Sequence, residues 1–485
     1  MGALVKYLSL VFLLPAGVAL GYGESAWPFV LSAVVTVLAG WSLERVTQGK
    51  DRIGMREGFL VVALTWLLAA LFVCLPYLFA DDPQLGSPLN AYFESMSGLT
   101  TTGASVLTDI EALNHSLAMW RQFSQWIGGM GIIVLALAVL PRLRVGGRQL
   151  LESELPGPDV EKLTVSIRTV ARRLGVLYLA LTVLMVLVLA VIGWTGLDER
   201  MNLFEAVAHA FATLPTGGFS TQARSIEGFS AATQWAIVGF MALAGVNFAL
   251  MYRAVLRQGR PWRDEELRLY VFLLLGASVV LFAKLVGREI YEGEEAVRHS
   301  VFQTVSIMTT TGYASADFNE WPIFAGMVLV ALMLIGGSAG STAGAIKVVR
   351  LLVLTRILRR ELDQTVHREA VVPIRFNGSA LDERTVRSVG AFVLLYLVVF
   401  ALGTLGLVIS EAINTARTDL DWPDAISATA TTLGNVGPGL GFLGPMGSFD
   451  SFSDSSKAIL IALMWMGRLE LIPVVILLTR NYWRA

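Results

Sequence analysis

Threonine and glycine recur together in four short segments that interrupt long apolar runs. We call these the Thr/Gly segments, and they read Thr100-Thr101-Thr102-Gly103-Ala104, Pro215-Thr216-Gly217-Gly218-Phe219, Thr309-Thr310-Thr311-Gly312-Tyr313 and Gly434-Asn435-Val436-Gly437-Pro438. Glycine permits the positive φ that turns successive carbonyls the same way without a Cβ clash. Rings of backbone carbonyls can replace the hydration shell of a cation. The chemistry that these residues could do is therefore the coordination of a dehydrated cation.

The residues expected to contact the ion are the glycine that occupies the equivalent place in each segment and the two residues before it. They are Thr101, Thr102, Gly103, Thr216, Gly217, Gly218, Thr310, Thr311, Gly312, Asn435, Val436 and Gly437. The second and fourth segments lack the Thr-Thr-Thr run, so the pattern predicts cation conduction and leaves the selectivity among cations open. The alternative is close helix packing through small residues, but such motifs belong inside continuous helices.

The composition requires a membrane environment for these segments. Of the 485 residues, 55% are hydrophobic and only 15% are charged, and the mean hydropathy is +0.63, whereas a soluble domain is about 25% charged. Apolar runs of the length needed to cross a bilayer predict ten spans. They lie near 4–20, 27–43, 57–80, 118–141, 171–194, 232–256, 268–287, 323–358, 389–411 and 456–479.

The charged residues predict which side each loop occupies. The loops at 43–57, 142–173, 252–268 and 347–388 hold 4, 7, 5 and 9 basic residues, and the loop at 81–119 holds no Lys or Arg. Basic loops stay in the cytoplasm, so both termini are expected there, in agreement with an even number of spans. The net charge of −1 gives no reason to expect a nucleic-acid partner.

One unit recurs four times after an N-terminal transmembrane hairpin. It consists of a span, a short half-helix near 88–99, 201–214, 296–308 or 421–432, a Thr/Gly segment and a second span. Four flanking pairs support the alignment, namely Phe93-Glu94, Phe204-Glu205, Phe302-Gln303 and Asp424-Ala425. We predict an all-α polytopic membrane protein with four helix/pore-helix/filter/helix repeats around one central pore. The predicted divisions are the hairpin at 1–50 and the repeats at 55–145, 168–258, 266–360 and 388–485.

With these four segments, the chain resembles the Trk/Ktr/HKT superfamily of potassium transporters, and its TrkH-type branch most closely. The resemblance implies a pseudo-fourfold pore within one subunit, a homodimer, and K⁺ uptake across the bacterial inner membrane. It also implies that a soluble TrkA-type nucleotide-binding regulator docks on the cytoplasmic stretches 142–173 and 347–387. The other interpretation of those basic stretches is contact with anionic membrane lipids. The chain has no Walker or Rossmann motif, so we expect no nucleotide site of its own.

A glycine-rich stretch in the long span at 323–358 is the expected gate. We call it the glycine loop, and it comprises Gly336, Gly337, Ser338, Ala339, Gly340, Ser341, Thr342, Ala343 and Gly344. Glycine destabilises a helix by about 1 kcal/mol relative to alanine, and the resemblance implies an obstructing loop below the filter. The alternative is a packing face formed by the glycines spaced four apart.

Three polar residues in the spans complete the expected site. A mid-membrane charge such as Arg468 needs water or a partner, and the resemblance implies that it faces the pore beside the glycine loop. The alternative is an ion pair with Glu470 or another buried acid. Lys347 is expected to be an interfacial anchor, and Asn247 either lines the inner vestibule or hydrogen-bonds between helices.

Two other classes of function remain as alternatives. One is a symporter coupled to protons or Na⁺. The sequence argues against it, because Glu470 lies beside Arg468 and a carboxylate neutralised by a cation is a poor proton relay. The other is a polytopic enzyme that acts on a lipid-linked substrate, which should show a cluster of acids and histidines at one end of a span. The acids of the outer loops are instead scattered.

Overall fold

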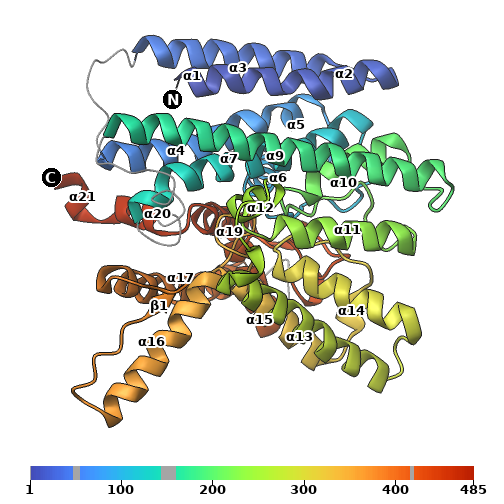
Figure 1. The fold of residues 1–485 in the computed structure, drawn as a ribbon. Coiled ribbons are helices and arrows are strands. Elements are labelled where there is room, and N and C mark those ends of the chain that lie inside the picture. Colours follow the sequence, from blue (N-terminus) through green and yellow to red (C-terminus); the bar gives the residue numbers. More distant parts are fainter. Residues whose placement is uncertain (1, 47–54, 144–159, 415–419, 485) are drawn as a thin grey trace.

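The computed structural model describes residues 2–46, 55–143, 160–414 and 420–484. Those residues are largely helical, and their only strands are β1 (Arg375–Phe376) and β2 (Ser379–Ala380), which pair antiparallel. Long helices lie side by side across the molecule, and the N and C labels lie at the same side of it (Figure 1).

The N-terminal hairpin packs along one flank of the molecule (Figure 1). It contains α1 (Gly2–Leu8), the 3₁₀ turn η1 (Ser9–Phe12), α2 (Leu13–Tyr22) and α3 (Trp27–Val46). A Cβ on Gly40 would lie 2.5 Å from the backbone nitrogen of Lys6, so the lack of a side chain allows α1 and α3 to meet backbone to backbone. Phe12 packs against Trp120 of the first repeat with its ring tilted, and Phe29 meets the same ring edge-on.

Four units follow, each with a first span, a short pore helix and a second span. The first has α4 (Met55–Val73), α5 (Leu75–Phe79), α6 (Pro88–Leu99) and α7 (His115–Leu143); the second has α9 (Val160–Trp194), α10 (Leu203–Thr213), α11 (Ala231–Ala244) and α12 (Phe248–Val255). The third has η2 (Pro261–Arg263), α13 (Glu265–Gly287), α14 (Gly293–Met308), η3 (Phe318–Glu320), α15 (Ile323–Ile335) and α16 (Val348–Val366). The fourth has α17 (Glu383–Ile413), α18 (Trp422–Gly434), η4 (Gly441–Leu443), η5 (Phe449–Ser451), α19 (Asp454–Arg468), α20 (Ile472–Val475), η6 (Ile476–Leu478) and α21 (Arg480–Arg484). Helices α9, α16 and α17 extend across the predicted limits at 168, 360 and 388.

The second span is broken in three of the four units. Helices α11 and α12 bend by 102°, α19 and α20 bend by 115°, and the glycine loop separates α15 from α16. Within the described residues, six helices are long and apolar enough to cross a membrane, or eight when each bent pair counts as one span. Two of the ten predicted spans are not among these eight: the one at 118–141, in α7, and the one at 323–358, which the glycine loop divides into α15 and α16.

The hydrophobic core forms two clusters that divide the repeats into pairs. One cluster joins the second and third repeats through residues such as Met241 and Leu281. The other joins the hairpin to the first and fourth repeats through residues such as Phe12, Trp120 and Leu460. Trp126 of α7 packs against both clusters. The buried core residues of α14 belong to the first cluster and those of α6 to the second, whereas α18 contributes to both.

The turn of the hairpin is fixed to the start of α7 by one carboxylate. Glu24 accepts hydrogen bonds from the backbone nitrogens of His115 at 2.8 Å and Ser116 at 2.9 Å. Burial raises the pKa of the Glu24 carboxyl, but hydrogen bonds from Ser116 and His115 outweigh burial and bring the pKa below its ordinary 4.5. A negative group at this place also complements the positive end of the helix dipole.

We expect Glu24→Gln to loosen this attachment by about 1 kcal/mol, as for loss of a helix cap. The measurement is hydrogen exchange of the His115 and Ser116 amides, which should be roughly fivefold faster. Because the folded-state pKa is lowered, the stabilisation is complete above the unfolded pKa and is lost as the pH falls through the folded value. Glu199→Gln, at an exposed acid between α9 and α10, is the control. Equal exchange in both variants would contradict the attachment.

Candidate ion-binding site

All four pore helices end in the same backbone turn. Its left-handed residues are Thr101, Thr216, Thr310 and Asn435, with φ of 51°, 57°, 59° and 54°. In the first repeat, the nitrogen of Thr101 donates to the oxygen of Gly98 at 3.0 Å and that of Thr102 donates to Ser97 at 2.8 Å, and the other three repeats have the same pair of bonds. This is the Schellman arrangement, in which the left-handed residue is usually Gly or Asn. Three β-branched threonines in this conformation are therefore unusual.

The four Thr/Gly segments meet in a closed ring. A Cβ on Gly103 would lie 2.2 Å from the oxygen of Gly217, and one on Gly218 would lie 1.8 Å from that of Thr311. One on Gly312 would lie 1.9 Å from the oxygen of Val436, and one on Gly437 would lie 2.9 Å from that of Thr102. Each glycine thus faces the carbonyl of the next segment, and the fourth faces the first. The glycines have φ of 82°, 79°, 80° and 113°, all in the region that favours glycine.

The twelve residues predicted to contact the ion therefore lie together. Side chains and backbone groups link neighbouring repeats around the ring. Asn435 donates to the Oγ1 of Thr102 at 2.9 Å, and the Gln125 amide donates to the oxygen of Gly217 at 2.6 Å. The nitrogen of Ile226 donates to the oxygen of Ala314 at 2.9 Å, and the Asn319 amide donates to that of Gly441 at 2.8 Å. Each of the four boundaries is thereby held by at least one hydrogen bond.

One pocket opens on the ring, and the four glycines Gly103, Gly218, Gly312 and Gly437 all belong to its lining. Its one charged lining residue is Arg121 of α7. The Arg121 Nε lies 2.8 Å from the Glu94 carboxylate, and both side chains are almost fully buried. The Glu94 carboxylate also accepts from the hydroxyl of Ser105 at 3.0 Å. This ion pair fixes the chain where it leaves the first Thr/Gly segment.

The predicted alignment of the flanking pairs is wrong in two repeats. Glu94 and Gln303 lie seven residues before the left-handed residues of their segments, whereas Glu205 and Asp424 lie eleven before theirs. The shift is one helical turn, so the carboxylates do not occupy equivalent places. In the second repeat, the place of Glu94 is taken by His209, whose Nε2 lies 3.1 Å from the Ser220 hydroxyl.

Sequence reasoning missed Arg121 and Gln125, which support the ring from α7. Gln125 both donates to the oxygen of Gly217 and accepts from the nitrogen of Phe219 at 3.1 Å. The signal was present, because Arg121, Gln122, Ser124 and Gln125 place four polar residues within an otherwise apolar predicted span. Polar side chains inside a span usually face the interior of the bundle.

The glycine loop lies against the other end of the ring, where the pore helices end. The Thr342 hydroxyl donates to the oxygen of Leu214 at 3.1 Å, after α10, and the nitrogen of Gly344 donates to the Thr310 hydroxyl at 2.9 Å, after α14. A Cβ on Gly344 would lie 2.2 Å from the oxygen of Gly434, at the end of α18. Gly336 and Gly340 have positive φ of 75° and 72°. The stretch is an irregular loop and not the helical packing face considered as its alternative.

Arg468 lies beside this loop at the end of α19. It is 3% exposed, and its Nη1 donates to the oxygen of Thr342 at 2.8 Å. Its Nε and Nη2 have no hydrogen-bond partner among the described residues. A buried guanidinium is thus directed at the loop with most of its donors unused.

The alternative in which Arg468 pairs with Glu470 is not what the structure shows. Glu470 lies 2.8 Å from the Nζ of Lys347 and 2.5 Å from the Nη2 of Arg350. The prediction that Lys347 is an interfacial anchor is also wrong, because Lys347 is 5% exposed. The chain reverses its expected course here, since Lys347, Glu470 and Leu471 all have positive φ. Periodicity along a continuous helix cannot reveal such a break.

Asn247 caps α12 at the bend after α11. Its Oδ1 accepts from the nitrogens of Ala249 at 2.9 Å and Leu250 at 3.2 Å. A Cβ on Gly340 would lie 3.2 Å from the Asn247 Nδ2, so the side chain also touches the glycine loop. Asn247 therefore lies next to the glycine loop. Its role as a helix cap was not predicted, because the sequence indicated one unbroken span at this place.

Comparison with known proteins agrees with this architecture. The family model described as "TrkH: Cation transport protein" matches residues 28–484. The Trk system potassium uptake protein TrkH of Vibrio parahaemolyticus is 40% identical, over 100% of this chain and 98% of that protein. Its counterpart in Escherichia coli K12 is 37% identical over the same shares.

The structural comparison confirms the predicted fold class. The crystal structure of the potassium transporter TrkH from Vibrio parahaemolyticus matches with a TM-score of 0.88 at 38% identity, and the match covers 100% of this chain and 98% of that one. The alternative of a membrane enzyme is not supported, because the matching family is one of transport proteins. With the family model matched over almost the whole length, the chain belongs to the TrkH family of cation transport proteins.

Proposed function

We propose that this protein takes up K⁺ across the bacterial inner membrane by conduction through the ring of four Thr/Gly segments. The observation that carries the proposal is the closed ring, in which the glycine of each segment faces a backbone carbonyl of the next. Relatives that the chain matches over its full length are potassium uptake proteins by name. Non-helical backbone is tolerated at membrane depth where it is buried in protein or lines a wet cavity.

The charges around the ring favour a cation. The four pore helices direct their C-terminal ends, which carry partial negative charge, toward the Thr/Gly segments. The single charge in the pocket lining, Arg121, is held by Glu94. An ion that leaves water at this pocket would therefore meet carbonyl oxygens before any unpaired positive charge.

We propose channel-like permeation in preference to coupling with protons or Na⁺. The sequence argument for it placed Glu470 beside Arg468, but the structural support is different. Glu94 is engaged by Arg121, and Glu470 is engaged by Lys347 and Arg350. Carboxylates held in fixed ion pairs are poor proton carriers, because protonation would leave the partner cation buried and unpaired.

The proposal extends to assembly and orientation. We place both termini, α16 and the β1–β2 hairpin at the cytoplasmic side, as the basic loops favour. We further propose a homodimer with a cytosolic TrkA-type nucleotide-binding regulator docked on the basic stretches, with membrane lipids around the spans. The division into repeats at 55–145, 168–258, 266–360 and 388–485 belongs to the same proposal. Co-purification of the native membrane complex tests the regulator, and its mass tests the dimer.

The test of conduction is rubidium uptake by proteoliposomes that contain the pure protein. We expect K⁺-competed uptake down the electrochemical gradient, with equal initial rates at matched membrane potential whether or not Na⁺ or a pH gradient is present. Uptake that requires either gradient would contradict channel-like permeation. Absence of any K⁺-competed uptake would contradict the proposed function.

Substitution of the ring glycines should reduce uptake in an order that follows the measured approaches. Serine at Gly218 or Gly312 places a Cβ within 1.9 Å of a neighbouring carbonyl oxygen, and serine at Gly103 places it at 2.2 Å. We expect at least a tenfold loss of K⁺-selective uptake for these three variants. The loss should be smaller for Gly437→Ser, where the approach is 2.9 Å.

The matched control for this series is Gly239→Ser, because nothing lies within 4 Å of a Cβ at Gly239. Size-exclusion profiles in detergent would verify that each variant folds. Selective uptake that survives in the well-folded Gly218 and Gly312 variants would reject the assignment of the ring as the filter.

We expect Arg468→Ala to increase maximal rubidium uptake severalfold. A buried guanidinium with unused donors beside the glycine loop opposes a cation that passes the loop, and it also holds the loop through the Thr342 carbonyl. Arg480→Ala, in the exposed C-terminal helix α21, is the control and should leave uptake unchanged. Reduced or equal uptake in Arg468→Ala would contradict a gating role.

A further inference from the structure

Three consecutive acids at the start of α13 have three different tasks. Asp264 caps the helix by accepting from the nitrogen of Leu267 at 2.9 Å. Glu265 pairs with Arg356 of α16 at 2.9 Å. The Oε1 of Glu266 accepts from the nitrogen of Ala339 at 2.6 Å, within the glycine loop. Glu266 is 5% exposed, so its carboxylate is buried against the loop.

Glu266 holds this part of the glycine loop through its side chain, whereas the other hydrogen bonds that reach it from described residues outside the loop join backbone atoms. Residues 338–340 are also held by backbone bonds, from the nitrogen of Ser338 to the oxygen of Gly245 and from the nitrogen of Phe248 to the oxygen of Gly340. Within the described residues, Glu266 is the one side chain outside the loop that hydrogen-bonds to 338–340. The nearby cations Lys347 and Arg350 donate to Glu470.

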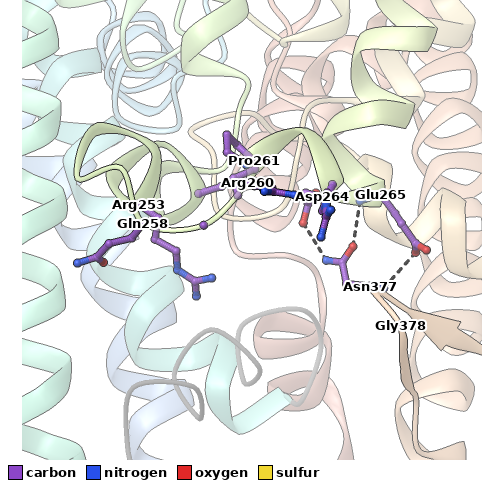
Figure 2. Close-up of a pocket in the computed structure, with 11 residues that line it drawn as sticks. Arg253, Gln258, Arg260, Pro261, Asp264, Glu265, Asn377 and Gly378 are labelled. Carbon is purple, nitrogen blue, oxygen red and sulfur yellow. Dashed lines mark hydrogen bonds between the residues drawn. The ribbon is translucent and has the colours of Figure 1, made fainter.

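The same acidic turn is fastened to the β1–β2 hairpin. Asn377 donates from Nδ2 to Asp264 at 2.8 Å, accepts at Oδ1 from the nitrogen of Glu265 at 2.9 Å, and donates from its own nitrogen to the Glu265 carboxylate at 3.1 Å. Figure 2 shows Asn377 directed at Asp264 and Glu265 beside an open pocket. Asn377 and Gly378 have φ of 49° and 81°, as expected for a stiff two-residue Asn-Gly turn.

We propose that Glu266 is a positioning residue that holds the glycine loop in its blocking place, and that Asn377 couples this hold to the cytoplasmic hairpin. The inference rests on the proposed function, because it assigns the loop as the gate. The bond from the Ala339 nitrogen to Glu266 is the side-chain contribution to the attachment of residues 338–340. A displacement of the β1–β2 hairpin would move the first turn of α13, and with it the Glu266 side chain that binds the Ala339 amide.

Maximal rubidium uptake should rise severalfold in Glu266→Ala, with the half-saturating concentration and the preference for Rb⁺ over Na⁺ unchanged. Glu266→Gln should lie closer to the native protein, because its amide oxygen still accepts from Ala339. Glu199→Ala is the control. Asn377→Ala should give a smaller rise, and its effect should not add to that of Glu266→Ala if both act through one connection.

Hydrogen exchange of peptides that cover 336–344 supplies a readout that does not depend on transport. We expect faster exchange in Glu266→Ala than in Glu266→Gln, in detergent-purified protein of normal size-exclusion profile. Unchanged exchange, or uptake that falls in Glu266→Ala, would overturn the inference. Dependence of uptake on a pH gradient that Glu266→Gln abolishes would also overturn it, since the carboxylate would then carry protons.

These outcomes separate the inference from the proposed function. If native liposomes take up rubidium and the ring-glycine variants lose it, but Glu266→Ala behaves like Glu199→Ala in both assays, only the inference fails. If native liposomes show no K⁺-competed uptake, the proposed function fails, and the exchange comparison alone decides whether Glu266 holds the loop.

Discussion

Four glycines without side chains allow four bent backbone segments to close on one another, and the rest of the molecule depends on this closure. Any Cβ at Gly103, Gly218 or Gly312 would overlap the neighbouring carbonyl oxygen. The pore helices have to end at the ring, and their exposed carbonyl groups need partners there. Each helix therefore ends in the same Schellman turn. The left-handed backbone conformation of Thr101, Thr216 and Thr310 costs of order 1–3 kcal/mol for each residue. The conformation persists because the packing around the ring leaves no alternative.

Closure also places a buried charge, Arg121, next to the ring, and this charge is fully paired. A buried charge without a partner is costly, whereas a paired one with further hydrogen bonds can be retained. Arg121 has Glu94, the Ser105 hydroxyl at 3.3 Å and the oxygen of Ser220 at 3.1 Å, and its guanidinium lies 4.2 Å from the centre of the Phe219 ring. One side chain of the first repeat thus fixes the exits of two segments. Arg468 differs in having unused donors, and this difference distinguishes a structural charge from one available to act on an ion or on the loop.

The sequence was sufficient for the ring and insufficient for what holds it. Repetition of Thr and Gly between a half-helix and a span located the segments, because only a local pattern was needed. Arg121 and Gln125 were missed because they act on Gly217 and Ser220, about a hundred residues away in the chain. The Lys347, Arg350 and Glu470 cluster was missed for a related reason. Positive φ at Lys347 and Glu470 reverses the chain, and hydropathy counts apolar residues without indicating where a span breaks.

The breaks are distributed unevenly, and the distribution separates the repeat that supports the ring from the repeats that contact the glycine loop. The second spans of the second, third and fourth repeats are interrupted, whereas α7 of the first runs from His115 to Leu143. The unbroken helix supplies Arg121 and Gln125, which need a rigid base because they position ring backbone. The glycine loop contacts the ends of α10, α14 and α18, the pore helices of the three interrupted repeats. Irregular backbone at Gly245, Gly336 and Glu470 leaves room for a loop that a straight helix would displace. An arrangement with four equal repeats could close a ring, but it would provide no place for a loop that enters from one side.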